Sequence, residues 1–510
     1  MSNRPQLPTA FLDRMRQLLG DEFDRFIDSY DEPALRALRI NPLKVNAAET
    51  KTLLSELYLN NGANCEDRDI SNVPWCNLGY YFGDDLRPGT HPCHAAGTFY
   101  IQEPSAMLPG ELAHIAINRI IRKKGFVRVL DMCAAPGGKS THVAGYIGNK
   151  GILVANEPVP TRAKILSQNI ERMGLTNTLV CNEMSDKLAS VFPGFFDVIL
   201  TDVPCSGEGM FRKDDVAITE WSEENVDMCV KRGTEILDAA HICLKHDGCI
   251  VYSTCTYEPA ENEEAVKRFA DSHPGYSVAK VRVSGIEPSV DGTYRIWPHK
   301  HKGEGHFAAV LTAADESDWT GECTDSQSAL DEAVRSEEAS EANTKNSKRI
   351  SGAYVCDKKL SKDAQNLLKE FFAETLTSKS YDSINGVMIA FGDNIYCVPE
   401  ELVSYVTASD RLRSLRIERP GLHIGTLKKG RIEPSHSLAL ALSPGMCVNE
   451  VMLKARDERV IKYLQGESIS CDSSLKGYAV VYVDGYSIGW GKASGGVLKN
   501  HYPKGLRYRP

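Results

Sequence analysis

The chain has 510 residues, too many for a single hydrophobic core, so we expect two to four domains. Its apolar runs are short, which excludes a membrane span, and its first residues lack the long apolar segment of a signal peptide. Fifteen cysteines without a CxxC pair argue against a zinc or disulfide framework and favour the reducing cytoplasm.

The net charge of -9 says little about partners, because much of it lies in one segment. Ten Asp and Glu residues stand between Thr312 and Thr344, opposed only by Arg335. This stretch is also rich in Ser, Thr and Ala, so we predict an acidic disordered linker over residues 312–350. The folded parts are then close to neutral and carry basic clusters of their own.

The first part of the chain, residues 1–104, is predicted to be a separate N-terminal domain. Apolar residues recur at helical spacing from residue 8 to about residue 60, beginning with Phe11, Met15 and Leu18. The segment ALRALRINPLK then predicts a strand that Pro42 ends, with Arg36, Arg39 and Lys44 around it.

Residues 105–311 alternate between strand and helix patterns. The predicted strands are VRVLDM, GILVANE, NTLVC, FDVILTDV and GCIVYST, and HFAAVLTA is expected to close one edge. Their apolarity is continuous rather than alternating, which is typical of parallel strands buried on both faces. We therefore predict an α/β fold with a doubly wound, Rossmann-like core.

Two further modules are predicted after the linker. Residues 351–435 mix a helix, DAQNLLKEFFAETL, with short strands. Residues 436–510 contain LALALS, VVYVDGYSIGWGKASGG and a basic ending, which favour a compact β-rich module.

A small-residue loop follows the first strand of the core and precedes a helix, in VLDMCAAPGGKSTHVAGYIG. Such a loop lets the backbone approach a ligand. It is not a Walker A loop, because Cys133 stands where the first glycine is required, and GxGxxG is absent. Glu157 ends the second strand, where a carboxylate can accept hydrogen bonds from a ribose. An adenosine site without a pyrophosphate cradle points to S-adenosyl-L-methionine.

Two cysteines stand at the ends of the fourth and fifth strands, Cys205 in DVPCSG and Cys255 in YSTCTYEPAEN. Neighbouring strand ends bring both thiols to the crevice that holds the cofactor. A thiolate that adds to carbon 6 of cytosine makes carbon 5 nucleophilic, and a second acid/base group can help eliminate the methylated product. Spacing alone does not rank the two thiols.

These segments resemble the Sun family of RNA cytosine-5 methyltransferases. The resemblance rests on LDMCAAPGGKS, ANEPVPTRAKILSQNIERMGLTN, DVILTDVPCSGEGMFRKD and IVYSTCTYEPAENE, with RINPLK, GTFYIQEPSAMLP and EGHFAAV as flanking segments. The tail, WGKASGGVLKNHYPKGLRYRP, is similar to the PUA-like module of bacterial ribosomal RNA members. The resemblance implies a methyltransferase core and an RNA-contacting N-terminal domain.

The family pattern also implies roles for single residues. Cys255 would be the nucleophile on carbon 6, Cys205 would promote release of the product, and Asp202 would contact the cytosine edge. Lys139 and Arg162 match polar family positions near the donor and the base. The implied cofactor set is Cys133, Ala134, Ala135, Pro136, Gly137, Gly138, Lys139, Glu157, Arg162 and Asp202.

One position departs from the family. At the end of the third strand, where the family has an acidic residue at the cofactor, the spacing places Met184, with Glu183 and Asp186 beside it. Either a neighbour substitutes, or the adenine end of the donor is held more loosely.

Alternatives to this interpretation stay open. The thiol roles are exchanged if Pro204-Cys205 acts like the Pro-Cys dipeptide of DNA cytosine methyltransferases. A nitrogen-directed methyltransferase would favour an NPPY-like tetrad in place of DVPC, and it would have no use for two thiols. A degenerate, non-enzymatic RNA-binding protein has only Met184 in its support.

The expected partner is RNA, with no membrane and no metal, and a monomer is the default state. The PUA-like tail favours ribosomal RNA or an assembling ribosomal subunit over transfer RNA. Phosphate contacts are expected from three basic clusters. These are Arg411, Arg413, Arg416 and Arg419; Lys428, Lys429 and Arg431; and Lys499, Lys504, Arg507 and Arg509. Tyr486, Trp490, Tyr502 and Tyr508 are candidates for stacking on bases.

Overall fold

The computed structural model describes residues 5–59, 71–83, 85–313, 360–381, 384–407 and 415–508. Almost all of the predicted acidic linker, 312–350, lies outside these ranges. So do the basic residues Arg411, Arg413 and Arg509. Among the described helices, none combines the length and the apolarity that crossing a membrane requires.

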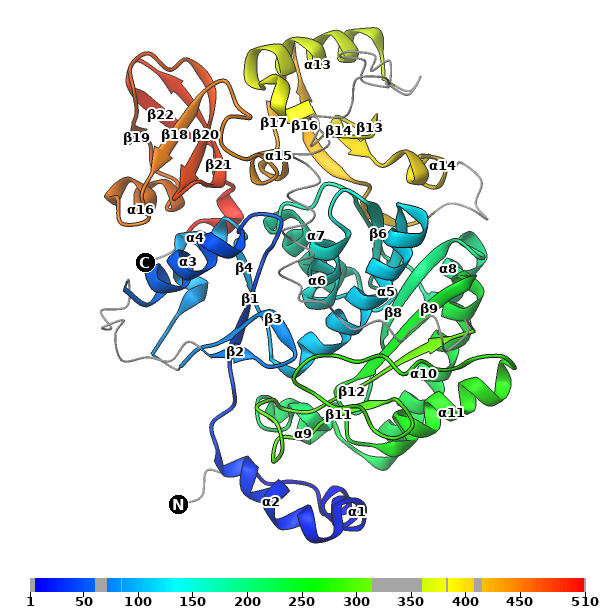
Figure 1. Ribbon diagram of the computed structural model, residues 1–510. Helices are drawn as coiled ribbons and strands as arrows, with labels where there is room; N and C mark the ends of the chain where they lie inside the picture. Colours follow the sequence, from blue (N-terminus) through cyan, green and yellow to red (C-terminus); the bar gives the residue numbers. More distant parts are fainter. Residues whose placement is uncertain are drawn as a thin grey trace.

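The N-terminal region has two separate parts (Figure 1). Two helices, α1 (Thr9–Leu19) and α2 (Phe23–Asp28), lie apart from a small antiparallel sheet. The sheet has the order β2-β3-β1-β4. Its strands are β1 (Ala37–Ile40), β2 (Asn72–Val73), β3 (Cys76–Tyr81) and β4 (Phe99–Ile101), accompanied by α3 (Ala47–Leu59) and α4 (Pro92–Ala95).

The two N-terminal helices pack against loops of the central domain. Phe11 meets the ring of Phe211 edge-on, with centroids 5.1 Å apart, and Phe26 meets Tyr257 at 5.3 Å. Arg14 extends this contact through ion pairs with Glu208 and with Glu258. The helical pattern at the start of the chain therefore serves the central domain rather than the N-terminal sheet.

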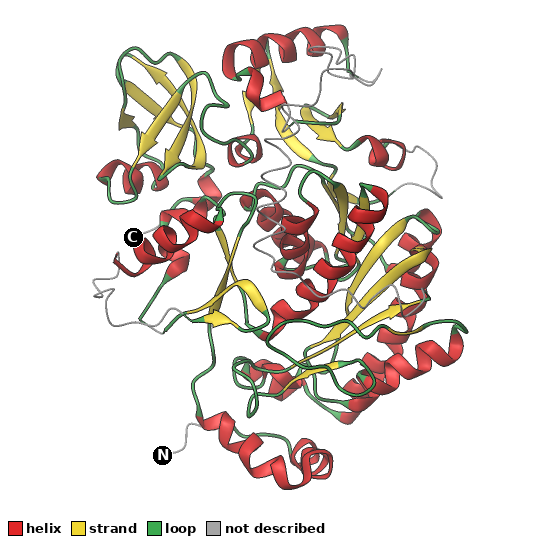
Figure 2. Cartoon of the chain, viewed as in Figure 1, coloured by secondary structure: helices red, strands yellow, loops and turns green. Residues whose placement is uncertain are grey.

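The central sheet contains the five predicted parallel strands in the order β9-β8-β5-β6-β7. They are β5 (Val127–Asp131), β6 (Gly151–Asn156), β7 (Thr178–Cys181), β8 (Phe196–Asp202) and β9 (Leu244–Thr254). Helices cover both faces (Figure 2). The doubly wound, Rossmann-like prediction is confirmed.

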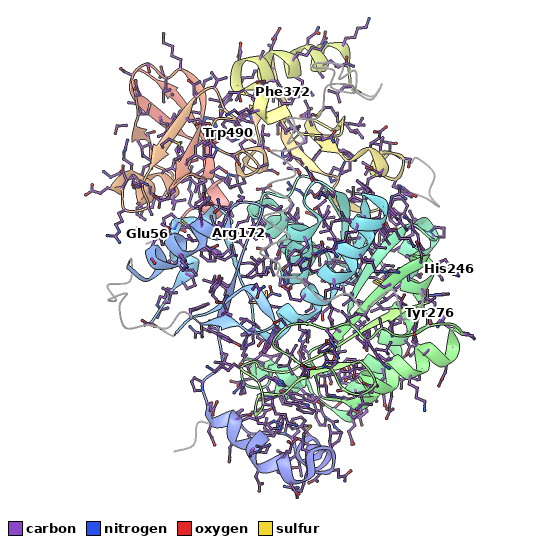
Figure 3. The ribbon with its side chains drawn as sticks, viewed as in Figure 1. Glu56, Arg172, His246, Tyr276, Phe372 and Trp490 are labelled. Atoms are coloured by element: carbon purple, nitrogen blue, oxygen red, sulfur yellow. The ribbon has the colours of Figure 1, made fainter. Side chains whose placement is uncertain are left out.

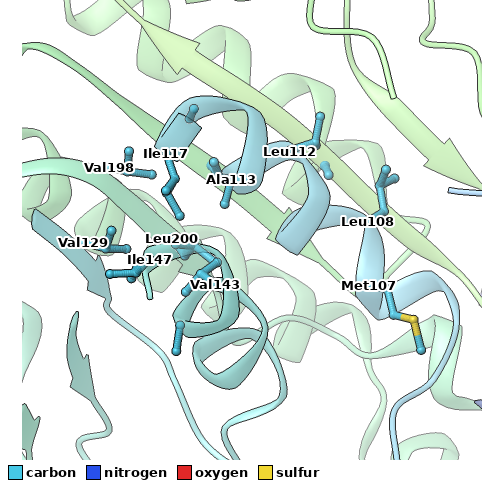
Figure 4. Close-up of a cluster of buried hydrophobic side chains, with 14 of the residues drawn as sticks. Met107, Leu108, Leu112, Ala113, Ile117, Val129, Val143, Ile147, Val198 and Leu200 are labelled. Carbon is cyan, nitrogen blue, oxygen red and sulfur yellow. The ribbon is translucent and has the colours of Figure 1, made fainter. Parts of the chain in front are cut away.

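Alternate residues of each strand face different helices. Val129 and Val198 lie in one core with α5 (Leu108–Lys124), α6 (Gly138–Ile147) and α7 (Pro160–Arg172), as Figure 4 shows for the first two. Leu130 and Ile199 lie in a second core on the other face. That core includes residues of α8 (Ser185–Val191), α10 (Glu223–Cys243) and α11 (Glu263–Ser272), and the short α9 (Asp215–Glu220) follows the Cys205 loop.

Both edges of this sheet differ from the prediction. The expected edge strand, β12 (His306–Thr312), runs antiparallel beside β9, but it is itself covered by β10 (Ser277–Val278) and β11 (Tyr294–Ile296). At the opposite edge, β7 pairs with β15 (Ile417–Arg419), a strand from beyond the linker. An edge strand with unpaired main-chain groups accepts such a partner, and local sequence patterns do not identify the partner.

The module after the linker contains the predicted helix, α13 (Lys362–Thr375), and a four-stranded sheet that the helix contacts. The sheet order is β13-β14-β16-β17. Its strands are β13 (Val387–Phe391), β14 (Asn394–Val398), β16 (Leu422–Lys428) and β17 (Arg431–Pro434), with α14 (Val403–Val406) between the second and third.

The last module is rich in strands, with the order β18-β20-β21-β22-β19. It contains β18 (Glu450–Leu453), α16 (Glu458–Leu464), β19 (Ile469–Ser470), β20 (Gly477–Val483), β21 (Tyr486–Ser494) and β22 (Val497–Asn500). LALALS is not one of its strands, because its first residues end α15 (His436–Leu440), which packs on β16 and β21. Trp490 of β21 is 1% exposed and joins this core to that of α13 (Figure 3).

Candidate active site

The structure brings the two strand-end cysteines together. Cys205 follows β8 and Cys255 follows β9, and these strands are parallel neighbours. The two Sγ atoms are 3.4 Å apart, and the main-chain N–H of Cys255 lies 3.3 Å from the Cys205 sulfur, to which it donates. Both cysteines are half-buried, so neither is sealed within the core.

Hydrogen bonds fix the two cysteine loops to each other. The Ser206 N–H donates to the Glu261 carboxylate at 3.0 Å, and the Ser206 and Thr256 hydroxyls are 2.7 Å apart. The Gly209 N–H donates to the Cys255 carbonyl at 2.8 Å. A Cβ on Gly209 would stand 2.8 Å from that oxygen, so this close approach requires glycine. Glu261 belongs to the IVYSTCTYEPAENE motif, but its sequence position alone does not indicate this contact.

A charged pair lies beside the thiols. Lys139 Nζ is 2.8 Å from Asp202 Oδ2, and the Ser253 hydroxyl donates to Asp202 Oδ1 at 2.8 Å. Burial by itself raises the pKa of Asp202, but the Lys139 ammonium and the hydrogen bond from Ser253 outweigh burial and hold that pKa below its usual range. Asp202 is therefore a carboxylate at neutral pH.

The thiol of Cys205 has a pKa well above its ordinary value. The hydrogen bond to Cys255 is the largest cause, and burial adds to it. Cys205 therefore keeps its proton as long as the Cys255 sulfur is not bonded to a substrate. The Cys205 thiol can then donate a hydrogen bond that stabilises a thiolate on Cys255.

The predicted cofactor residues meet at the turn from β5 into α6. Side chains from other elements hold the carbonyls of this loop: Arg39 donates to Gly138 at 2.8 Å, Asn169 to Pro136 at 2.8 Å, and Arg162 to Ala135 at 3.0 Å. Gly137 has a φ of +114°, which glycine adopts without strain. A loop of small residues held in this way suits close approach of a ligand to its backbone.

Glu157 and Arg162 connect the second strand to that loop. Glu157 is buried, and its Oε1 accepts from the Val159 N–H at 2.9 Å while Oε2 pairs with Arg162 at 3.3 Å. Each carboxylate oxygen keeps a second lone pair, so ribose hydroxyls can still donate to it. Asp131 Oδ1, at the end of β5, is buried without a hydrogen-bond partner among the described residues. Burial raises the pKa of Asp131 to about 7. These donors and acceptors fit an adenosine-containing ligand.

Met184 occupies the position after the third strand, β7, where the family has an acidic residue. Met184 is 58% exposed, whereas Glu183 is buried and its carboxylate accepts from the Arg416 N–H at 2.6 Å and from the Arg416 guanidinium at 3.0 Å. Glu183, one of the two acidic neighbours of Met184, is thus paired with the module beyond the linker. The sequence offered no signal for this pairing.

Comparison with known proteins agrees with this geometry. A model described as 16S rRNA methyltransferase RsmB/F matches residues 121–312. Models for the N-terminal domain of 16S rRNA methyltransferase RsmF, its first C-terminal domain and its PUA domain match residues 7–104, 370–442 and 451–508. These four matches follow one another from residue 7 to residue 508, so each module of the chain is similar to a module of RsmF-type methyltransferases.

Curated relatives carry the same description. Ribosomal RNA small subunit methyltransferase F of Vibrio vulnificus (strain YJ016) is 28% identical over 99% of this chain and 98% of its own length. The Erwinia tasmaniensis protein of that name is 33% identical over 61% of this chain. This second match spans 64% of the Erwinia protein, slightly less than two thirds of its length.

Solved structures share the fold of the central domain. A methyltransferase homolog protein from Pyrococcus horikoshii is 25% identical, with a TM-score of 0.50 over 60% of this chain and 94% of its own. NSun6 from Pyrococcus horikoshii, solved with SFG, is 21% identical, with a TM-score of 0.50 over 60% of this chain and 99% of its own.

Part of the predicted RNA-binding surface is corrected. Arg419 is only 4% exposed, pairs with Glu171 at 3.1 Å and cannot reach phosphates. Trp490 and Tyr502 are buried in the last module and cannot stack on bases, because apolar packing there outweighs their polar edges. Sequence position did not separate these core aromatics from surface ones.

An exposed basic surface remains on the two C-terminal modules. Lys428, Lys429 and Arg431 are exposed at the β16–β17 turn, and Lys499 is exposed on β22. Lys492 Nζ lies 5.4 Å from the ring centroid of the partly buried Tyr478. We call Lys428, Lys429, Arg431, Lys492 and Lys499 the basic surface.

One buried polar cluster lies apart from the predicted site residues. Cys76, Glu111 and His142 carry donor atoms of the metal-ligand type within 4.8 Å of one another, in the part of the chain that the structure describes. The carboxylate of Glu111 accepts from Tyr146 at 2.7 Å and lies 3.0 Å from His142 Nε2. These bonds account for the cluster as a hydrogen-bonded network between β3, α5 and α6.

Proposed function

We propose that this protein transfers a methyl group from S-adenosyl-L-methionine to carbon 5 of a specific cytidine in small-subunit ribosomal RNA. The observation that carries the proposal is the pair of thiols 3.4 Å apart, at the ends of neighbouring strands, with a lysine-paired carboxylate beside them. Carbon 5 of cytosine needs a transient nucleophilic adduct before it can accept a methyl group. Transfer to nitrogen needs no such adduct.

In this mechanism, the Cys255 thiolate adds to carbon 6 of the cytosine. Before this addition, the Cys205 thiol donates a hydrogen bond to the Cys255 sulfur, and this hydrogen bond raises the pKa of Cys205. Once Cys255 is bonded to carbon, Cys205 has no thiolate to stabilise, and its proton passes to solvent. The Cys205 thiolate is then a base.

Product release reverses these roles. Cys205 takes the proton from the methylated carbon 5, the bond between carbon 6 and the Cys255 sulfur breaks, and its electron pair returns to the sulfur. The regenerated Cys255 thiolate again accepts a hydrogen bond from Cys205. Lys139 keeps Asp202 ionised, and the Asp202 carboxylate accepts hydrogen bonds from the cytosine edge. The carboxylate also stabilises the positive charge that develops on the ring when the ring carries an additional proton.

S-adenosyl-L-methionine supplies the methyl group when it is bound. The loop from Cys133 to Lys139 would hold S-adenosyl-L-methionine through main-chain groups, and the Glu157 carboxylate would accept hydrogen bonds from its ribose hydroxyls. Arg162 keeps both in register, because it bonds to Ala135 and to Glu157 at once. Asp131 adds a buried acceptor at the end of β5.

RNA as the substrate is supported by the family match and by the basic surface, where exposed cations can neutralise phosphates. The target base must leave its stack to reach the half-buried thiols, at a cost of a few kcal/mol. Single-stranded or junction RNA meets that cost most easily.

Bisulfite mapping of total RNA, with and without this protein in its own cells, tests the proposal. We expect one position of 16S ribosomal RNA to lose 5-methylcytosine, and the gene for Cys255→Ala not to restore it. A loss confined to transfer RNA would support the transfer RNA alternative instead. Nucleoside mass spectrometry that finds a lost N4-methylcytidine and intact 5-methylcytidine would contradict carbon-5 chemistry.

A further inference from the structure

His306 lies in the proposed active site, although the mechanism above gives it no step. It is the first residue of β12, which pairs with β9 so that Phe307 stands opposite Thr254. Continuing this register by one residue brings His306 to Cys255. His306 is 4% exposed, so its imidazole belongs to the interior of the site rather than to its rim.

The two ring nitrogens of His306 are not equivalent. The imidazole donates a hydrogen bond to the main chain at Gly305. Nε2 is buried without a hydrogen-bond partner among the described residues, so Nδ1 is the nitrogen that donates. Neutral imidazole carries one N–H and one lone pair. Nε2 is therefore an acceptor.

The charged groups around His306 favour this neutral form. Burial, together with the Lys139 ammonium, lowers the pKa of His306 to about 4, although Asp202 and Glu103 oppose that shift. Nε2 lies 3.9 Å from Asp202 Oδ1. Lys139 holds the other oxygen of that carboxylate. The site thus presents two acceptors side by side, each able to take one more hydrogen.

We propose that His306 recognises the exocyclic amino group of the target cytosine, its Nε2 accepting one amino hydrogen while Asp202 Oδ1 accepts the other. Two N–H bonds diverge from one amino nitrogen, which suits two acceptors on different strands. Uracil has a carbonyl oxygen at that place, and it would face two acceptors with no hydrogen to share. His306 is then a residue that selects cytidine, an assignment that rests on the proposed function.

The alternative is that His306 only fills space beside Phe307. His306→Phe keeps a ring of similar size and removes the acceptor, and His306→Gln keeps an acceptor of similar reach. His423 offers a matched control on β16 of another module, because it is a half-buried histidine whose Nε2, like that of His306, is buried without a hydrogen-bond partner among the described residues. Its ring stacks on Tyr396, with centroids 4.7 Å apart.

The test is a double-mutant cycle that combines a change in the protein, at His306, with a change in the RNA, at the amino group of the target base. The RNA segment identified by bisulfite mapping is synthesised with cytidine, or with the 2-pyrimidinone riboside that lacks the amino group, at the target. The rate of covalent adduct formation is measured in single turnover, with S-adenosyl-L-methionine, for full-length proteins in a Cys205→Ala background. Removal of the amino group should slow the parent about a hundredfold, about tenfold for each of the two hydrogen bonds that it donates to His306 and Asp202.

His306→Phe should slow the reaction with cytidine about tenfold, and removal of the amino group should then cost only about a further tenfold, for the remaining hydrogen bond to Asp202, so that the two losses do not multiply. His306→Gln should restore part of the preference for cytidine, and His423→Phe should behave as the parent. Losses that multiply in His306→Phe, or an unchanged rate with cytidine, would overturn the role of His306 while the adduct formed by the parent upholds the proposed function. A parent that forms no adduct with either RNA would overturn both.

Discussion

Removal of the Lys139 ammonium should change how activity depends on pH. Lys139→Met deletes the donor 2.8 Å from Asp202 Oδ2 and leaves the burial that raises the pKa of Asp202. A hydrogen bond between charged groups contributes about 1.5–3 kcal/mol. The Asp202 side chain is 31% exposed, so we take the lower half of that range, which corresponds to about 1 to 1.5 pKa units.

The sign follows from the direction of each shift. In the parent, the pKa of Asp202 is lowered, so the carboxylate persists and its stabilising contribution is lost only as pH falls well below neutrality. In Lys139→Met the pKa rises, and activity that needs the carboxylate should fall at a higher pH. Since the rise of about 1 to 1.5 units starts from a pKa below the usual value of about 3.9, the two profiles of kcat/KM for methyl transfer should coincide between pH 8 and pH 6, and the fall on the acidic side should come about one pH unit higher than in the parent.

A second lysine that pairs with a buried aspartate separates this effect from loss of stability. Lys124 pairs with Asp197 at 3.1 Å, near the opposite ends of β5 and β8. Lys124→Met should lower the melting temperature and leave the pH profile of kcat/KM unchanged, whereas Lys139→Gln should lie between Lys139→Met and the parent. Superimposable profiles for Lys139→Met and the parent would refute the claim that Lys139 keeps Asp202 ionised.

Three further changes address other parts of the chain. Glu183→Ala should lower the free energy of unfolding by about 2 kcal/mol in urea titrations, because the Arg416 N–H loses its acceptor, and an unchanged midpoint would contradict a structural role for this pair. Trp490→Ala should cost about 3–5 kcal/mol, as expected of a buried core aromatic rather than a stacking platform. Lys492→Ala should leave stability unchanged and reduce the slope of log affinity for RNA against log salt by about 0.7–0.9, and an equal slope would remove Lys492 from the RNA surface.

The sequence predicted those features that depend on local pattern. Buried parallel strands have a continuous apolar pattern, so the β5–β9 core was predictable. Reactive residues that directly follow the carboxyl ends of neighbouring parallel strands come close together, so the contact between Cys205 and Cys255 was predictable as well. The helix after the linker, DAQNLLKEFFAETL, was also predicted from its own sequence, and it forms α13.

The features that the sequence did not predict depend on contacts between distant segments. Nothing near Arg416 signals that its strand joins the edge of the central sheet and closes on Glu183, 233 residues away. Trp490 reads as an aromatic near lysines, and only the packing of two modules around it makes it a core residue. His306 stood in a quoted motif, but its role depends on the cross-strand neighbour and on an unpartnered ring nitrogen, and both require coordinates.

The division of labour between the thiols is the central claim, and covalent adduct formation tests it most directly. Cys205→Ala and Cys255→Ala proteins are incubated with target RNA and S-adenosyl-L-methionine, and the products are separated under denaturing conditions. We predict that Cys205→Ala accumulates a protein–RNA adduct, because no base removes the carbon-5 proton, and that Cys255→Ala forms neither adduct nor methylated RNA. An adduct that persists in Cys255→Ala would contradict the assignment and exchange the two roles.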